Sequence, residues 1–280
     1  MTFPLHKISW AVLAVIAGLV IAMQPTALSI AGIALVALVL SIVITPYAAL
    51  TLMLVIAPLR TLIATEAPIQ LPLDIGQISL IVFIGVWAGE SLVNRRRLPR
   101  IRWTPVYLPV IGFFAAASLS AFTALSMSAW LNEWLKWAQI LVLIALIFDL
   151  GKRNQGREWI VFALTLAGVA NAIIGIYEFF GGSGALHLLV NGDNFRAFGT
   201  FGQPNPFGGF MGLIAPLALM SALGYAIRGW TKWRKQLTLT LADLAPILYY
   251  GAAFVLMAAG VYMSYSRGAW LAFVASLAVM

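Results

Sequence analysis

Nine long apolar runs follow one another along the chain, and short polar segments separate them. A helix needs about 20 consecutive apolar residues to cross the roughly 30 Å hydrocarbon core of a bilayer. We therefore expect an all-α fold, a polytopic transmembrane helical bundle that forms a single integral-membrane domain over residues 1–280. The nine expected spans cover residues 8–23, 27–44, 46–63, 75–93, 105–125, 130–149, 158–180, 205–227 and 245–263.

A tenth apolar run begins at Gly268 and continues to Met280. Its 13 residues are too few to cross a bilayer, and no polar residue or charge flanks its end. We therefore expect that the chain is a fragment of a longer protein, cut at its carboxyl end within the tenth span.

Composition excludes a soluble domain and several kinds of site. Only 9% of the residues are charged and 62% are hydrophobic, whereas a soluble domain has about 25% charged residues. The chain contains no cysteine, which excludes disulfides, thiolate metal ligands and a cysteine nucleophile. We expect no metal site and no cofactor, because no close carboxylate pair exists among the acidic residues assigned to the outer side. These residues are Glu66, Asp74, Glu133, Glu178 and Asp193.

The basic residues orient the expected spans. Cytoplasmic loops carry an excess of Lys and Arg, and most of the 17 basic residues cluster in segments 95–102, 152–157 and 228–235. All three clusters lie inside if the amino terminus is cytoplasmic. The net charge of +8 then reflects membrane orientation, so we expect no nucleic-acid partner. A second span follows the first at once, which favours an uncleaved signal anchor over a cleaved signal peptide.

The longest outer loop, residues 181–203, carries the first part of a candidate site. The loop is rich in glycine, including Gly199 and Gly202, whose backbone can take positive φ and lie close to a ligand. Asn205 is predicted to be the N-cap of the eighth span, with Pro206 as its first helical residue.

A second helix start completes the candidate site. Ser266 is predicted to cap the tenth span, and Arg267 and Gly268 lie in its first turn. The amino ends of the eighth and tenth spans carry unpaired N–H groups and face outward. With Arg196 and Arg267 beside them, they would form a site for a dianion or diphosphate. Arg60, at the outer end of the third span, is a further candidate, and the alternative role for such arginines is to reach lipid phosphates or to fix a loop.

Other polar and small residues have narrower interpretations. His187 lies in the outer loop and is a candidate base, with simple solvation as the alternative. Asn171 and Glu178 share one helical face in the seventh span, where ionisable groups are functional candidates or are merely hydrated. Gly208 and Gly212 are predicted to form a helix-packing face. An interfacial aromatic belt is predicted for Trp130, Trp134 and Trp137.

Two segments resemble the motifs of the O-antigen ligase and O-antigen polymerase superfamily of bacterial envelope proteins. The first is Arg196-x-x-Gly-Thr-Phe-Gly-Gln-Pro-Asn205, and the second is Ser264-x-Ser-Arg-Gly-Ala-Trp270. The related core covers about residues 160–280. The resemblance implies a GT-C-like membrane glycosyltransferase that works without metal at the outer (periplasmic or exterior) face of the bacterial inner membrane.

The resemblance also implies substrates and roles. The donor would be an oligosaccharide on undecaprenyl diphosphate, and the acceptor a lipid A core sugar, a growing glycan or a protein side chain. Arg196 and Arg267 match the motif arginines, so they would bind the diphosphate and stabilise its growing charge. The base would be a histidine beyond residue 280, with His187 as the candidate within this chain.

Two rival functions remain open from the sequence. A transporter or flippase for an anionic lipid-linked glycan could use the same outer arginines, although it would need polar groups near the middle of the membrane. Mid-span charges are nearly absent, since Glu90 lies toward the inner end of its span and Glu178 toward the outer end. The second rival is an assembly subunit without activity.

Overall fold

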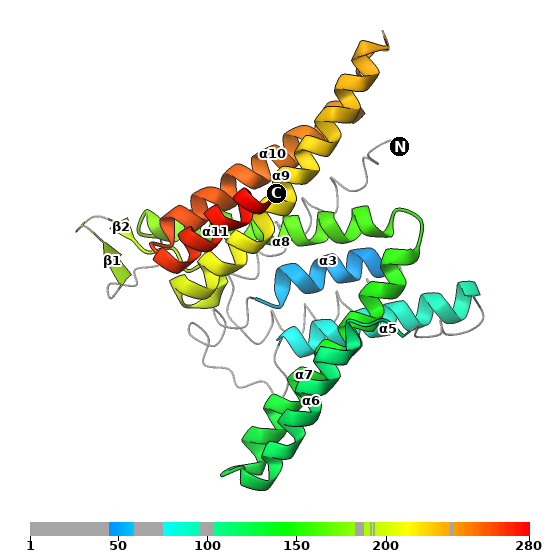
Figure 1. Cartoon of the computed structure of the whole chain (residues 1–280), viewed down its shortest axis with the longest axis vertical. Helices are drawn as coiled ribbons and strands as arrows, with labels where there is room; N and C mark the ends of the chain where they lie inside the picture. Colours follow the sequence, from blue (N-terminus) through cyan, green and yellow to red (C-terminus); the bar gives the residue numbers. More distant parts are fainter. Residues whose placement is uncertain are drawn as a thin grey trace, which may run out of the picture.

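The computed structural model describes residues 45–58, 75–95, 103–182, 188–190, 192, 194–235 and 238–280 (Figure 1). Helices form most of this part of the chain. They are α3 (Pro46–Ile56), α5 (Ile75–Arg95), α6 (Tyr107–Leu119), α7 (Met127–Lys152), α8 (Gly156–Phe179), α9 (Pro204–Arg234), α10 (Leu241–Met263) and α11 (Arg267–Val279), with the short 3₁₀ helices η1 (Ser120–Thr123) and η3 (Gly199–Phe201). A small antiparallel hairpin pairs β1 (Leu189–Val190) with β2 (Asn194–Phe195).

Five of these helices are long and apolar enough to cross a membrane. They are residues 75–92 of α5 and the whole of α7, α8, α9 and α10, while α3, α11 and the α6–η1 segment are apolar but shorter. The prediction of an all-α, membrane-embedded protein is therefore confirmed. The expected spans 8–23 and 27–44 lie outside the described residues, and the expected spans 46–63 and 105–125 correspond only to the shorter α3 and α6–η1 segment. The number nine therefore stays a prediction.

The core nearest the candidate site is formed by α8, α9, α10 and α11. The side chains of Phe207, Met211 and Met257 are fully buried there. A Cβ on Gly208 would lie 2.7 Å from Ser264 Oγ and 2.8 Å from Ala269 Cβ. The predicted packing role of Gly208 is therefore confirmed, because α11 and the end of α10 approach α9 where a side chain would obstruct them.

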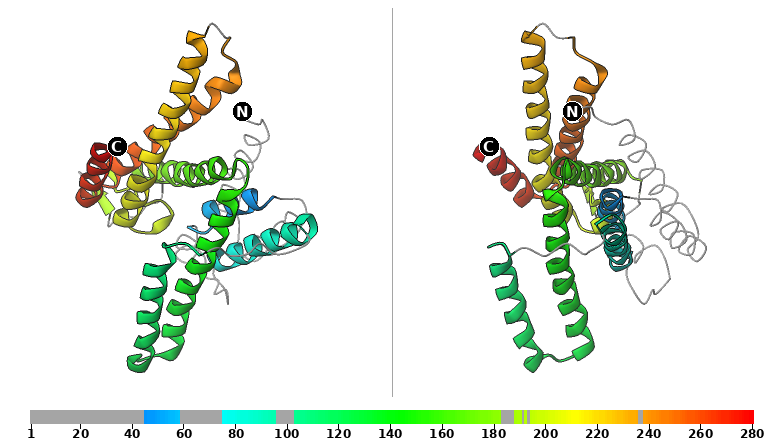
Figure 2. Two further views of the ribbon diagram at one scale, coloured as in Figure 1. Left: turned by 45° about the vertical axis from the view of Figure 1, so that its right-hand side comes forward. Right: turned by 90° about the vertical axis from the view of Figure 1, so that its right-hand side faces the viewer.

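The helices α6 and α7 form a hairpin that extends away from the other helices (Figures 1 and 2). Two of the predicted belt residues fasten it, since Trp130 Nε1 donates to Ser120 Oγ at 3.0 Å and Trp134 Nε1 donates to Ser118 Oγ at 2.9 Å. These indoles satisfy their N–H groups within the hairpin, which leaves apolar ring surface for a membrane interface.

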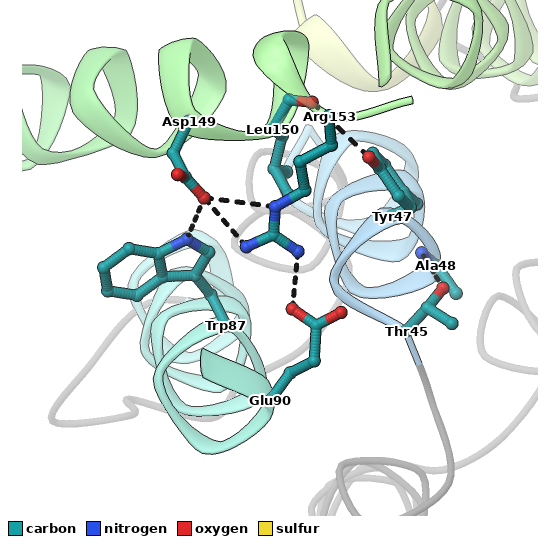
Figure 3. Close-up of polar contacts among 8 residues, drawn as sticks. All are labelled: Thr45, Tyr47, Ala48, Trp87, Glu90, Asp149, Leu150 and Arg153. Atoms are coloured by element: carbon teal, nitrogen blue, oxygen red, sulfur yellow. Dashed lines mark hydrogen bonds and ion pairs between the residues drawn. The ribbon is translucent and has the colours of Figure 1, made fainter. Parts of the chain in front are cut away.

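An ionic cluster joins α5 to the turn between α7 and α8 (Figure 3). Arg153 donates to Glu90 at 2.5 Å and to Asp149 at 2.8 Å, and Trp87 Nε1 donates to the same Asp149 oxygen at 3.0 Å. Burial disfavours the charge of Arg153, but hydrogen bonds to Asp149 and Glu90 outweigh it and raise the pKa of Arg153. At the predicted inner end of the membrane domain, these ion pairs and hydrogen bonds therefore hold α5 against the turn between α7 and α8.

Candidate functional site

Four helix ends meet on the side of the molecule opposite to the ionic cluster. They are the carboxyl ends of α8 and α10 and the amino ends of α9 and α11. The loop before α9 contacts the end of α10, because Ala197 N donates to Met263 O at 2.9 Å. The two sequence motifs, which are about seventy residues apart, therefore lie in contact.

Two buried polar side chains of α8 hold the first motif in place. Glu178 Oε2 accepts hydrogen bonds from Phe198 N at 3.0 Å and Gly199 N at 2.6 Å. Two turns earlier in α8, Asn171 Oδ1 accepts hydrogen bonds from Thr200 N at 3.3 Å and from Thr200 Oγ1 at 2.5 Å. Both α8 side chains are almost completely buried, so they satisfy loop groups that water does not reach. Their role is structural, and the interpretation of Glu178 as a hydrated group is wrong.

The glycines of the first motif take the predicted backbone conformation. Gly199 has a φ of +54° and Gly202 a φ of +69°, which side-chain-bearing residues rarely adopt. A Cβ on Gly199 would lie 2.7 Å from the ring of Phe207. The backbone of Gly199 therefore lies close to the buried ring of Phe207, a residue of the protein's own core.

The start of α9 differs from the prediction by two residues. The N-cap is Gln203, with extended backbone, and Pro204 is the first helical residue. The predicted cap at Asn205 is wrong because Pro204 already provides the fixed φ of a first helical position and forces Gln203 out of the helical region. Asn205 instead lies in the first turn, where its Oδ1 accepts a hydrogen bond from Arg196 Nη2 at 3.3 Å.

Arg196 clamps the loop onto the end of α10. Its Nε donates to Ser264 O at 3.0 Å, and its Nη2 donates to Tyr265 O at 3.3 Å. These carbonyls belong to the turn that ends α10, where such groups lack helical partners. Within the described part of the chain, no acceptor contacts Nη1. Arg196 therefore fixes the loop and still has two N–H donors to offer.

Arg267 occupies the position predicted for it, at the start of α11. Ser266 is the N-cap, and its Oγ accepts from Ala269 N at 3.4 Å. The side chain of Arg267 is exposed and contacts no acid or acceptor among the described residues. A cation in a first helical turn is electrostatically unfavourable, so an anion bound here would relieve a local conflict. A Cβ on Gly268 would meet nothing within 4 Å.

The residue directly before the N-cap of α11, Tyr265, has a strained backbone. Tyr265 has a φ of +50°, which is uncommon for any residue with a side chain and costs of order 1–3 kcal/mol. Its ring lies 5.9 Å from that of Trp270, whose Nε1 donates to Val261 O at 2.9 Å. The conformation of Tyr265 could not be predicted from its residue type, because it follows from the sharp turn between two packed helices.

Two predicted site residues, Arg60 and His187, lie outside the described residues. In the ranges that the structure describes, no group of three or more His, Asp or Glu residues could hold a metal ion.

Comparison with known proteins gives no match, since no family model, no curated protein and no solved structure matches the chain.

Proposed function

We propose that the protein transfers an oligosaccharide or polysaccharide from undecaprenyl diphosphate to an acceptor hydroxyl, at the end of the helices where the two motifs meet. The observation that carries the proposal is the clamp of Arg196 on the carbonyls of Ser264 and Tyr265. It brings one motif arginine to the residues directly before the other, Arg267. Two guanidinium groups beside two helix amino ends suit a lipid diphosphate.

The two arginines would have different tasks in this reaction. The leaving lipid diphosphate gains negative charge as the glycosidic bond breaks, so a fixed cation stabilises the transition state more than the ground state. Arg267, exposed and without a protein partner in the described ranges, would bind the diphosphate directly. Arg196 would hold the loop and offer Nη1. Arg60 remains a proposed third ligand.

We place this site in a larger architecture that follows from the sequence. The protein would have nine spans and the start of a tenth, with a GT-C-like arrangement and a cytoplasmic amino terminus. It would lie in the bacterial inner membrane with the site facing the periplasm or exterior. The acceptor would be a lipid A core sugar, a growing glycan or a protein side chain, and no cofactor would take part.

The acceptor hydroxyl needs a base, and Glu178 is a poor candidate. Its buried carboxylate accepts two backbone N–H groups of the loop, and moving it would release the motif from α8. A histidine from an outer segment would supply the base, as the resemblance implies, and His187 is the candidate within this chain.

The state of the intramembrane polar residues favours transfer at one face over transport across the membrane. A flippase needs polar groups that can receive a head group within the bilayer. In the part of α8 nearest the loop, Asn171 and Glu178 are committed to backbone groups of the first motif. They are therefore unsuited to a moving substrate.

Glycan transfer in membranes that contain Arg267→Ala tests the proposal. The variant should insert normally and transfer no glycan, while Arg267→Lys should restore only part of the activity because a point charge cannot reproduce a bidentate fork. Control membranes carry Lys136→Ala, which removes a cation from the exposed face of α7. Unchanged transfer by Arg267→Ala would refute the assigned role.

A further inference from the structure

The carboxyl end of α9 extends beyond the helix next to it. With 31 residues, α9 is about 46 Å long at 1.5 Å per residue, whereas α10, which packs along it (Figure 2), has 23 residues and is about 34 Å long. Both helices end at the candidate site, so the excess of about two turns lies at the other end of α9 (Figure 1, top). A bilayer core is about 30 Å thick, and the last turns of α9 therefore reach the headgroup layer.

These last turns form a basic segment, residues 228–235, in which few of the positive charges are paired with carboxylates. Arg228, Lys232 and Lys235 recur at a spacing of four and three residues, so they share one helix face. Only Lys232 has a carboxylate partner within the described ranges, since its Nζ donates to Asp243 at 2.5 Å. Arg228 lies 5.4 Å from the ring centroid of Tyr225. The basic segment thus presents three uncompensated cations, which include Arg234.

One oxygen of the Asp243 carboxylate, Oδ2, is engaged by three neighbouring donors. The oxygen that binds Lys232 also accepts from Thr240 N at 2.8 Å and from Thr240 Oγ1 at 2.6 Å. This carboxylate caps α10 and joins it to α9. It therefore fixes the turn beside the basic segment and leaves the remaining cations free for an external anion.

Two tryptophans give the basic segment an affinity for a membrane interface. Trp230 and Trp233 are 59% and 57% exposed, and their ring centroids are 5.1 Å apart. They lie on a different face from Arg228 and Lys235. Exposed indoles prefer the headgroup level, and adjacent lysines and arginines attract anionic headgroups by about 1 kcal/mol each.

We propose that the basic segment of α9 binds the headgroups of anionic phospholipids. The segment continues a helix long and apolar enough to span a membrane, so a bilayer surface lies beside it. Charge complementarity and the tryptophan pair favour a lipid over a soluble polyanion, which would gain nothing from the indoles. This site is separate from the candidate transfer site and independent of the proposed function.

Native mass spectrometry of the detergent-solubilised protein, titrated with phosphatidylglycerol or phosphatidylcholine of the same acyl chains, tests this proposal. The wild type should bind phosphatidylglycerol more tightly. Arg234→Gln combined with Lys235→Gln should weaken that binding about 30-fold, at about fivefold per cation, and leave phosphatidylcholine binding unchanged. The matched control combines Lys152→Gln with Arg157→Gln, which removes two exposed cations from the turn between α7 and α8 and should weaken binding clearly less than the Arg234/Lys235 variant does.

Three outcomes would overturn the proposal: equal binding of the two lipids by the wild type, an equal loss in the control variant, or full retention in the Arg234/Lys235 variant. Displacement of phosphatidylglycerol by glycerol phosphate or a short RNA at equal concentration would show a general anion site instead. If the double variant fails to fold, the salt dependence of lipid binding by the wild type still tests the proposal. Its preference for phosphatidylglycerol should decline as salt rises, and a salt-independent preference would refute the site.

Discussion

The guanidinium Nε of Arg196 donates a hydrogen bond to the carbonyl oxygen of Ser264, 3.0 Å away and 68 residues later in the chain. This contact joins a glycine-rich loop to the turn that precedes Arg267. Arg196 therefore helps to position the residues directly before Arg267. The two arginines should therefore respond differently to the same substitution.

Arg196→Ala should destabilise the protein, whereas Arg267→Ala should not. Loss of the clamp removes hydrogen bonds from a charged donor to two carbonyls, which we expect to lower the free energy of unfolding by about 2–3 kcal/mol. Arg267 is exposed and unpaired in the described part of the chain, so its removal should change stability by less than about 0.5 kcal/mol. Thermal unfolding in detergent measures both. Equal stability of the two variants would show that the clamp contributes nothing.

Glu178→Ala should release the first motif from α8. The substitution leaves the N–H groups of Phe198 and Gly199 without their acceptor, and each unsatisfied buried group costs about 1–3 kcal/mol. We expect a loss of about 2–5 kcal/mol in thermal unfolding and faster proteolysis of the loop 181–203. The control is Glu133→Ala, where an exposed pair with Lys136 is worth at most about 1 kcal/mol. Similar losses for both would contradict the role given to Glu178.

Gly199→Ala should be damaging, and Gly209→Ala harmless. Alanine at 199 would need a φ of +54° and would place its Cβ 2.7 Å from the ring of Phe207, so we expect a loss of more than about 2 kcal/mol. At Gly209 a Cβ meets nothing within 4 Å, and alanine in a helix is better than glycine by about 0.5–1 kcal/mol. The melting temperatures of the two variants should therefore change in opposite directions. A stable Gly199→Ala protein would refute the close packing.

Arg153→Ala should be among the most destabilising charge deletions. It leaves the carboxylates of Glu90 and Asp149 without their shared cation. Because the cluster is only partly buried, we expect a loss of about 2–3 kcal/mol, between that of an exposed pair and that of a fully buried one. Lys136→Ala removes an exposed cation of α7 and should cost less than about 1 kcal/mol. Denaturation of both variants in mild detergent measures the two losses of stability, and equal losses would show that Arg153 does not hold α5 to the turn between α7 and α8.

The helices could be predicted well because their signal is local. Apolar runs at 75–93, 130–149, 158–180 and 245–263 correspond closely to α5, α7, α8 and α10. The cap at Ser266 was also correct. The predicted start of α9 was wrong by two residues. Pro204 and Pro206 both suit the first turn of a helix, and the structure begins the helix at Pro204.

The interior of the site could be predicted only in part. Asn171 and Glu178 stood out as polar residues on one face of an apolar helix, but the sequence did not show which groups they meet. Apart from the hydroxyl of Thr200, the loop partners of Asn171 and Glu178 are backbone N–H groups, and the sequence does not show where backbone groups lie. The same limit applies to Arg196, whose acceptors Ser264 O and Tyr265 O are carbonyls far away in the chain.

Direct binding of undecaprenyl diphosphate to the purified wild type and to Arg267→Ala measures whether Arg267 contacts the lipid diphosphate. A charged hydrogen bond to phosphate is worth about 1.5–3 kcal/mol, so we expect at least a tenfold weaker affinity for the variant with an unchanged melting temperature. An affinity equal to that of the wild type would contradict the claim that Arg267 binds the lipid diphosphate.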